Sequence, residues 1–403
     1  MLRVRSLEPH TDTADRIPSL DILRGFALLG MFVVHFHARS TEPGGIDELV
    51  RTLVWRLVES KSHGTFALLF GAGFAIQLRR AEARGAPFAQ VYLRRLGVLA
   101  FFGFAAHAFF GYNVLLGYAV WGVLLLAIRK WSTGALIVAA LFSAASVALY
   151  SQFTNWLLAL SAGPDAVAAA ADARRALAAS VNGGLSAAAA QNSYSVLLAA
   201  RLRHMAWVYT QPFFFMPGAT LALFITGLLM VRHGVFERPL AHRGLLGAMA
   251  GFGLTCWVVD NWVISRWDLN LSLGILRDQW LLFAYVSAAL HLMAKRPGLM
   301  SSLCPIANAG RMALTNYLIQ IAALDLLFSG YALGPWAIRP LLGFASALAC
   351  FAIEVAFSSV WLRHFRFGPA EWLWRSITYG RWQPLRRPAL SVTGSTQTDR
   401  KTL

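Results

Sequence analysis

The sequence predicts an all-α integral membrane protein: a polytopic helical bundle of about ten transmembrane helices with both termini in the cytoplasm. Three observations support this fold class. Of the 403 residues, 57% are hydrophobic and only 14% are charged, whereas about a quarter of the residues of a soluble domain are charged. Apolar stretches long enough to cross a membrane recur along the whole chain. The basic residues, which give a net charge of +17, concentrate between alternate stretches.

The apolar stretches define the spans, because crossing the hydrocarbon layer takes roughly 17–25 apolar residues. The first span begins with Asp21 and Arg24, and no small-residue cleavage site follows it, so we do not expect a cleaved signal peptide. We expect residues 1–18 to be loose, residues 19–387 to form one bundle and residues 388–403 to be a disordered tail. The spans lie near 19–38, 63–78, 96–111, 114–128, 133–152, 206–230, 244–263, 276–294, 309–328 and 338–361.

The distribution of Lys and Arg predicts the orientation of the bundle. With ten spans and both termini inside, 24 of the 36 basic residues fall on the cytoplasmic side and 11 on the other, and Arg24 lies within the first span. Cytoplasmic loops of membrane proteins carry such an excess. The positive charge is therefore explained by topology, and we expect no nucleic-acid partner. A multi-pass protein of the bacterial inner membrane, in contact with membrane lipids, is the expected localisation.

Two segments outside the spans have a helical pattern of their own. Residues 153–205 are rich in alanine and predict two amphipathic helices on the outer membrane surface, broken at Asn182-Gly183-Gly184. This outer segment is either a spacer or a lid over a substrate entrance. Residues 366–384 predict a short interfacial helix, with Trp372 and Trp374 at headgroup level and Arg375 directed towards phosphates.

Several classes of function find no support in the sequence. The three cysteines show no CxxC or CxxH spacing, which excludes a disulfide framework and a cysteine zinc site. No metal-ligand spacing occurs on any one span, so no metal is expected. The sequence also has no GxSxG, P-loop or dinucleotide fingerprint. Gly71 and Gly73 would allow close helix packing and would permit a homodimer.

The first span carries the densest group of polar residues. At 100° and 1.5 Å per residue, Arg24 and His35 differ by 20° around the helix, and Asp21 and His35 by 40°. These three side chains therefore share one stripe, with Asp21 and His35 about 21 Å apart along the axis. Ionisable residues inside a membrane are costly and mark functional sites by default. A histidine is also the side chain best suited to accept a proton near neutral pH.

Structural explanations remain open for the same residues. Asp21 and Arg24 could form an i,i+3 ion pair that caps the helix start, and His35 could simply bond a neighbouring helix. His63 and His107 lie towards the predicted outer side and are reserve catalytic candidates. Asn316 and Gln320 share one helix face towards the inner side and are candidate substrate-binding residues.

Four stretches of the chain resemble the YeiB-like family, known as domain of unknown function 418. They read LDILRGFALLG (20–30), FALLFGAGFAIQLRR (66–80), GRMALTNYLIQ (310–320) and GPAEWLWRSITYGRWQP (368–384). The resemblance implies a bacterial inner-membrane protein, similar to a wider set of membrane acyltransferases. That set includes heparan-α-glucosaminide N-acetyltransferase and the polysaccharide O-acyltransferases.

The polysaccharide enzymes share an LDxLRG start that is followed, fourteen residues after the Asp, by a functional His. Asp21 and His35 have that spacing here, so the resemblance implies a catalytic role for both. Members of the YeiB-like family often carry Asn at the position of His35. A second departure is Asn113, where the family usually has an Asp.

Two classes of function fit these observations. As an acyltransferase, the protein would bind acyl-coenzyme A at a basic site on the cytoplasmic side, with acetyl-CoA the expected donor. It would transfer the acyl group to the hydroxyl or amine of a small-molecule or glycan acceptor. Alternatively, a transporter or flippase would use the same polar stripe as the path of a small metabolite or lipid-linked molecule. The expected donor-binding arginines, which suit phosphate because they form charged bidentate hydrogen bonds, are Arg24, Arg79, Arg80, Arg94, Arg95, Arg311 and Arg375.

Overall fold

The computed structural model describes residues 16–40, 44–111, 114–211, 218–264, 281–334 and 337–387. Within these ranges the regular secondary structure is helical, apart from two isolated β-bridges. Residues 1–15 of the predicted loose N-terminus, the predicted tail 388–403, and Asn113 lie outside the described residues.

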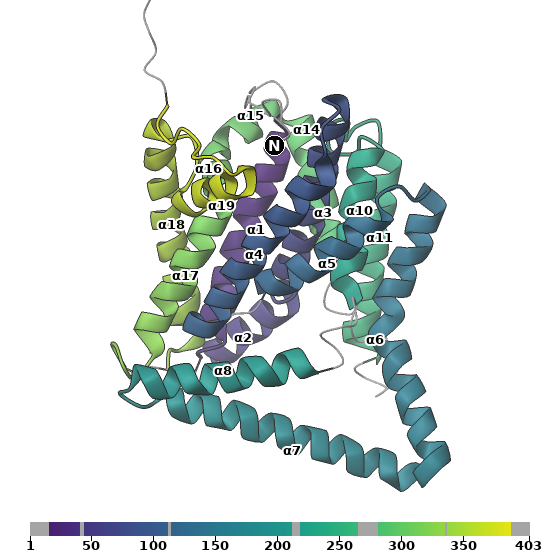
Figure 1. Ribbon diagram of the computed structural model, residues 1–403, viewed down its shortest axis with the longest axis vertical. Coiled ribbons are helices and arrows are strands. Elements are labelled where there is room, and N and C mark those ends of the chain that lie inside the picture. Colours follow the sequence, from purple (N-terminus) through teal and green to yellow (C-terminus); the bar gives the residue numbers. More distant parts are fainter. Residues whose placement is uncertain are drawn as a thin grey trace, which may run out of the picture.

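Among the described residues, ten helices run along the bundle and form its body (Figure 1). Helices α2 (Ile46–Leu57), α7 (Pro164–Ala189) and α8 (Tyr194–Thr210) lie at one end, here called the α8 end. Helices α15 (Pro297–Ser302), α16 (Cys304–Arg311) and α19 (Pro369–Tyr379) lie towards the opposite end, here called the α19 end. The ten long helices are α1 (Pro18–His37), α3 (Lys61–Ala83), α4 (Phe88–Phe110), α5 (Val114–Ile128), α6 (Thr133–Ala162), α10 (Gly218–Arg232), α11 (Arg243–Val258), α14 (Leu281–Lys295), α17 (Ala313–Phe328) and α18 (Pro340–His364).

The composition of the helices is that of a membrane protein. Helices α1, α4, α6 and α18 are long and apolar enough to cross a bilayer, and α5, α10, α14 and α17 are shorter apolar helices. Large hydrophobic side chains are exposed on the outside of the bundle, for example Val138, Leu141 and Phe142 on α6. Such a surface suits contact with lipid rather than water. The predicted all-α fold is thus confirmed, with four helices in the described part of the chain suited to cross a membrane. The ten spans and the cytoplasmic position of both termini stay predictions.

Helix α1 occupies the centre of the bundle, where 78% of its apolar window is buried. It packs against α3, α16, α17 and α18. Two glycines allow its close approach to α16: a Cβ on Gly25 would fall on the backbone of Ile306, and one on Gly310 would fall on the backbone of Asp21. Small residues at helix interfaces permit this backbone contact.

The glycines of α3 are used for packing inside the chain. A Cβ on Gly71 would fall on the backbone of Phe224 in α10, and one on Gly227 in α10 would fall on the backbone of Leu68. Gly73 instead faces the Arg24 side chain at 3.7 Å. The small-residue face of α3 therefore accommodates α10 and an arginine of α1.

The outer segment differs from the sequence prediction in where its helices break. Helix α7 runs without interruption through Asn182-Gly183-Gly184. The chain turns instead at residues 190–193, between α7 and α8, and at Gly163, between α6 and α7, where φ is +85°. Gly163 is followed by Pro164, which suits the first turn of a helix. Nothing lies within 4 Å of either Cβ position of the Gly pair, so neither glycine is required for close packing within α7.

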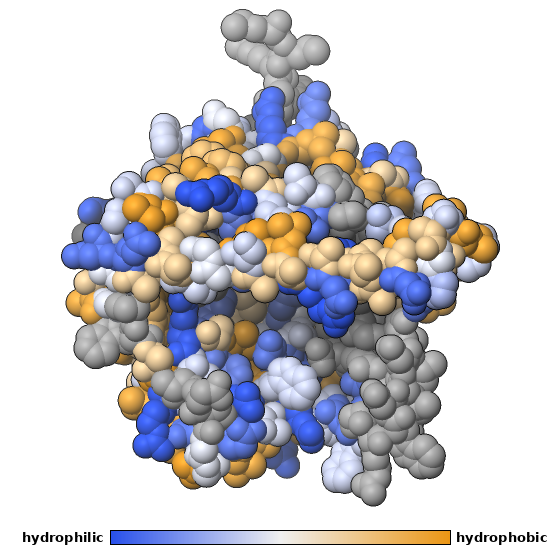
Figure 2. Space-filling view, turned by 90° about the horizontal axis from the view of Figure 1, so that it is seen from below, coloured by the Kyte–Doolittle hydropathy of each residue, from blue (hydrophilic) through white to orange (hydrophobic). Residues whose placement is uncertain are grey.

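The predicted span 206–230 is likewise divided in the structure. Its first part belongs to α8, which lies across the α8 end, and its last part is α10, which runs along the bundle (Figure 1). In the view onto the α8 end (Figure 2), hydrophobic and hydrophilic residues are mixed along the surface. A helix with polar and apolar residues both exposed fits a membrane surface better than a span.

Two polar clusters hold α8 against the bundle. In the first, buried Arg201 of α8 pairs with buried Asp325 of α17 and donates to the backbone oxygen of Phe109. Ser329 Oγ and Tyr331 Oη also donate to Asp325, at 2.8 and 2.7 Å. A buried charge pair of this kind is tolerated when its remaining hydrogen-bonding atoms are satisfied. The cluster fixes one part of α8 to α4 and α17.

The second cluster contains His107 of α4, which is fully buried. Its Nδ1 lies 2.9 Å from Tyr209 Oη, and its Nε2 lies 3.4 Å from His204 Nδ1, both on α8. Burial lowers the pKa of His204 below its ordinary 6.5. The neutral imidazole is therefore the form compatible with the docked helix.

We predict that acid pH loosens α8. Because the pKa of His204 is lower in the folded protein than its ordinary 6.5, protonation favours the undocked helix, and the stability contributed by docking is lost as pH falls through 6.5. The protection of the α8 amides against hydrogen exchange, corrected for the intrinsic exchange rate at each pH, should decrease between pH 7 and 5 in the wild type. In His204→Gln this pH dependence should largely disappear, and an unchanged dependence would exclude His204 as its origin.

Candidate functional site

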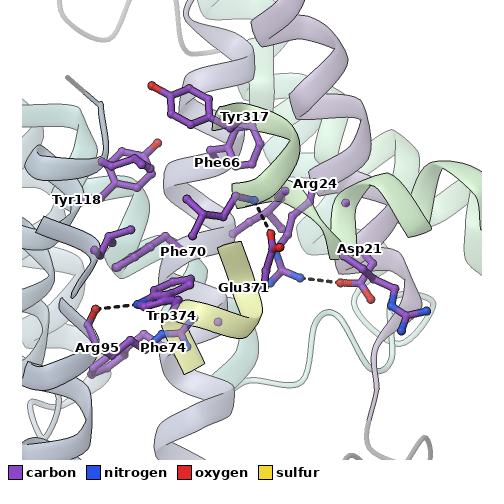
Figure 3. Close-up of a pocket in the computed structure, with 18 of the residues that line it drawn as sticks. Asp21, Arg24, Phe66, Phe70, Phe74, Arg95, Tyr118, Tyr317, Glu371 and Trp374 are labelled. Carbon is purple, nitrogen blue, oxygen red and sulfur yellow. Dashed lines mark hydrogen bonds and ion pairs between the residues drawn. The ribbon is translucent and has the colours of Figure 1, made fainter. Parts of the chain in front are cut away.

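A cavity of about 330 Å³ opens towards the α19 end of the bundle. Helices from both halves of the chain line it, with α1, α3, α4 and α5 from the first half and α16, α17 and α19 from the second. Figure 3 shows polar side chains on one side of this cavity and aromatic rings on the other. The cavity is therefore amphipathic, and its two parts have different chemistry.

Asp21 and two arginines form an ion-pair group at the polar side. Asp21 Oδ2 lies 2.8 Å from Arg16 Nε, and Asp21 Oδ1 lies 2.7 Å from Arg24 Nη1. The carboxylate is nearly buried, with 9% of its side chain exposed. The i,i+3 pair of Asp21 and Arg24 is thus present, and the second arginine leaves a net positive charge on the group.

Further arginines lie near this ion-pair group at the opening of the cavity, here called the cationic mouth. Burial, reinforced by the nearby Arg16 guanidinium, lowers the pKa of Arg311 to about 10. Burial also lowers the pKa of Arg375, with Arg16 and Arg80 acting in the same direction and Tyr379 opposing them. These shifts show that the cations lie within each other's field while remaining protonated at neutral pH. Such a cluster of like charges favours an anionic ligand.

Trp374 of α19 connects the cationic mouth to α4. The Arg95 guanidinium lies over the Trp374 ring, 3.6 Å from its centroid, and Trp374 Nε1 donates to the Arg95 backbone oxygen at 2.9 Å. Arg375 lies over Phe367, 4.5 Å from the ring centroid. Cation–π contacts of this kind orient a guanidinium without neutralising it. The charge of both arginines therefore remains available to a ligand.

Glu371 is the other carboxylate of the cavity lining, and it caps α17. Its Oε1 accepts the backbone N–H groups of Leu314 and Thr315 at 2.7 and 3.1 Å, and its Oε2 accepts Thr315 Oγ1 at 2.5 Å. Burial raises the pKa of Glu371, while the hydrogen bonds from Thr315 oppose that shift. A carboxylate in this position satisfies free N–H groups at a helix start. Glu371 thereby fixes where α17 begins beside the cavity.

The aromatic part of the cavity ends at a histidine and two tyrosines. His63 lies beside Tyr118, with 5.6 Å between ring centroids, and Tyr118 Oη donates to the His63 backbone oxygen at 2.9 Å. Tyr317 also lines the cavity. His35 is outside the cavity lining, and its ring centroid lies 6.4 Å from that of Tyr317. Phe66, Phe70 and Phe74 complete this part.

The cavity joins two segments that match known families. Residues 16–169 match the catalytic domain of heparan-alpha-glucosaminide N-acetyltransferase, and residues 230–381 match a protein of unknown function, DUF418. YxaH of Bacillus subtilis is 30% identical over 407 residues, which cover 95% of this chain and 98% of YxaH. The chain belongs to the YeiB-like DUF418 family.

Two further relatives of this family match the chain. A 39.9 kDa protein from the amylase 3′ region of Bacillus acidopullulyticus is 30% identical over 383 residues, covering 92% of this chain and 96% of that protein. YeiB of Escherichia coli K12 is 46% identical over 74 residues, 18% of this chain and 19% of YeiB. No solved structure gives a significant match. The DUF418 chain is thus an acyltransferase-like membrane protein.

Six of the predicted site residues of this DUF418 protein line one cavity, and the other seven lie outside its lining. Arg79 pairs with Glu237 at 2.9 Å on the surface. Asn316 and Gln320 bond Ser358 and Glu354 of α18, at 3.0 and 2.8 Å. Outside the cavity lining are His35, His107, Arg79, Arg80, Arg94, Asn316 and Gln320, whereas Asp21, Arg24, His63, Arg95, Arg311 and Arg375 line it.

Sequence reasoning did not single out several residues that shape the cavity. Tyr118 and Tyr317 lie within apolar stretches, where a tyrosine is an ordinary core residue, so no local pattern marks them. Glu371 could have been noticed as the only acidic residue of the stretch 368–384, directly after Gly368-Pro369-Ala370. Its partner, the start of α17, is more than 50 residues away, and only the fold connects them.

We predict that removing the Glu371 cap destabilises the protein. In Glu371→Ala, two backbone N–H groups and the Thr315 hydroxyl lose their acceptor, and buried unpaired donors cost about 1–3 kcal/mol each. The free energy of unfolding in detergent should fall by about 2–4 kcal/mol. Glu371→Gln keeps one oxygen for the backbone and should lose less than half as much. Equal losses for the two variants would show that the cap contributes little.

Proposed function

We propose that this protein is a membrane-embedded acyltransferase that moves an acyl group, in the first instance acetyl, from a cytoplasmic acyl-coenzyme A to a hydroxyl or amine acceptor at or across the membrane. The observation that carries the proposal is the amphipathic cavity: cations surround its mouth and an imidazole lies at its aromatic end. The match to the acetyltransferase catalytic domain supports the same chemistry. Acyl-coenzyme A combines a phosphorylated head with a thin arm that ends in a thioester.

The orientation that we propose follows from this cavity and from the charges. The ten long helices would all span the bacterial inner membrane, with both termini in the cytoplasm. The α19 end, which holds the cationic mouth, would face the cytoplasm, in keeping with the excess of Lys and Arg predicted for that side. The acceptor, a small molecule or glycan, would then approach from the α8 end. Helix α8, whose docking we predict to depend on pH, would lie on the route of the acceptor.

His63 is the proposed general base because it lines the cavity directly. Its imidazole would take the proton of the acceptor hydroxyl or amine while the oxygen or nitrogen attacks the thioester carbonyl. The carbon–sulfur bond then breaks, and the coenzyme A thiolate leaves and takes up a proton. His35 would act through Tyr317, and Asp21 would hold Arg24 and Arg16 in place at the mouth.

The proposal predicts different losses for the two histidines. His63→Asn should lower acyl transfer by roughly 10²–10⁴-fold, the range expected for removal of a general base. His35→Asn should also lower the rate, and His233→Asn, a surface control, should leave it unchanged. The measurement is thiol release from labelled acetyl-coenzyme A by protein in lipid nanodiscs supplied with acceptor extracts. Full activity in both His63→Asn and His35→Asn would refute acid–base catalysis by this cavity.

Neighbouring arginines provide a matched test of donor binding. Arg95 lines the cavity, whereas Arg94 is exposed outside it. Charged hydrogen bonds contribute about 1.5–3 kcal/mol, so Arg95→Gln should raise the dissociation constant of acetyl-coenzyme A by roughly 10- to 100-fold. Arg94→Gln should leave it unchanged. A protein that transports its ligand without consuming acyl-coenzyme A would bind no donor in this titration, and that result would refute the enzyme proposal.

A further inference from the structure

Helices α17 and α18 are joined by a ladder of buried polar side chains. Asn316 Nδ2 donates to Ser358 Oγ at 3.0 Å, and one turn further along α17, Gln320 Nε2 donates to Glu354 Oε2 at 2.8 Å. Asn316, Gln320 and Ser358 are fully buried, and Glu354 is 7% exposed. The ladder lies within two apolar helices and outside the lining of the cavity. It is therefore a feature separate from the proposed catalytic site.

Glu354 has little to stabilise a negative charge. In the described part of the chain its side chain takes part in one hydrogen bond, from Gln320, and in no ion pair with Lys, Arg or His. An ionised carboxylate in an apolar interior needs a cation or several donors, and without them the group takes up a proton. The surroundings of Glu354 therefore favour the neutral acid.

The side-chain amide of Gln320 has an acceptor for a hydrogen bond from a protonated Glu354. Gln320 Oε1 is buried and accepts no hydrogen bond in the described structure, although buried acceptors are normally satisfied. A protonated Glu354 would supply the missing donor through its second oxygen. Two hydrogen bonds would then join the side chains: Gln320 Nε2–H would donate to Glu354 Oε2, and Glu354 Oε1–H would donate to Gln320 Oε1. No other side chain of the ladder offers Gln320 a donor in the contacts described.

We propose that Glu354 and Gln320 form a proton-binding site within the membrane, in which a neutral carboxylic acid and an amide are paired by two hydrogen bonds. Loss of the proton would remove one bond and leave a charge facing the Gln320 oxygen. Since α17 also carries Tyr317 into the cavity, the bound proton holds a wall of the cavity against α18. Cys350 lies one turn from Glu354 on α18, Tyr317 lies on α17 and His35 on α1. The helices joined to or packed against this part of the chain also carry Asp325 on α17, Asp21, Arg24 and His37 on α1, Cys304 and Arg311 on α16, Asp47, Glu48, Arg51 and Arg56 on α2, and Arg363 and His364 at the end of α18. None of them forms an ion pair with Glu354.

Infrared difference spectroscopy on the full chain in lipid nanodiscs at pH 7 tests this site. The spectrum of the wild type minus that of Glu354→Gln should contain the C=O stretching band of a protonated carboxylic acid. Glu354→Gln should unfold at the wild-type temperature, because its amide can both donate to and accept from Gln320. A carboxylate band in place of the acid band would overturn the proposal.

Variants of the two hydrogen-bonded pairs of the ladder, Gln320–Glu354 and Asn316–Ser358, provide the matched control. This test does not require that Glu354→Gln folds. In protein labelled with ¹³C-glutamate, Gln320→Leu should shift the acid band to higher frequency, because the acid loses its acceptor. Asn316→Leu removes the Asn316–Ser358 hydrogen bond and should leave the frequency of the acid band unchanged. Equal shifts, or none, would contradict the pairing. A higher unfolding temperature of the wild type in sodium salt than in choline salt, with no such difference in Glu354→Gln, would identify a sodium site. That result would refute the proton site.

Discussion

The close approach of α1 and α16 is the constraint on which the cavity depends. Gly25 and Gly310 lie where any side chain would strike the backbone of the opposing helix, so the two helices meet at the distance that only glycine allows. This contact brings Asp21 of the first half of the chain beside Arg311 of the second. The cationic mouth therefore exists only when the segments resembling the acetyltransferase and the DUF418 family are assembled. Neither segment alone contains the mouth together with the Glu371 cap.

The bundle uses buried charge sparingly and places it at helix ends. Asp21 is paired with two arginines, Glu371 faces the start of α17, and Asp325 is paired with Arg201 near the other end of α17. At each of these positions a carboxylate satisfies hydrogen-bond donors that an apolar environment would otherwise leave unpaired. The arginines at the mouth differ, because they outnumber the carboxylates that face them. Their excess charge is not neutralised by the carboxylates that face them.

Sequence periodicity predicted the all-helical membrane bundle and the sharing of one stripe by Asp21 and Arg24, because both follow from local patterns. It could not predict which helices surround a cavity. His35 has the spacing of a functional histidine, yet it lies outside the cavity lining, whereas His63 and Tyr317 are part of that lining. The breaks of the outer segment were also missed: Gly183-Gly184 lies inside α7, whereas the chain turns at Gly163 and at residues 190–193, which contain no glycine.

Helix α17 connects the separate polar features of the molecule. Its start is held by Glu371, its middle by Gln320 against Glu354, and its end by Asp325 against α8. Tyr317 projects from the same helix into the cavity, one residue from Asn316 in the ladder. Because packed helices shift as units rather than bending, a change at any of these three contacts displaces the Tyr317 ring relative to His63. One helix therefore connects the His63 end of the cavity with the α19 mouth, with the Gln320–Glu354 pair and with α8.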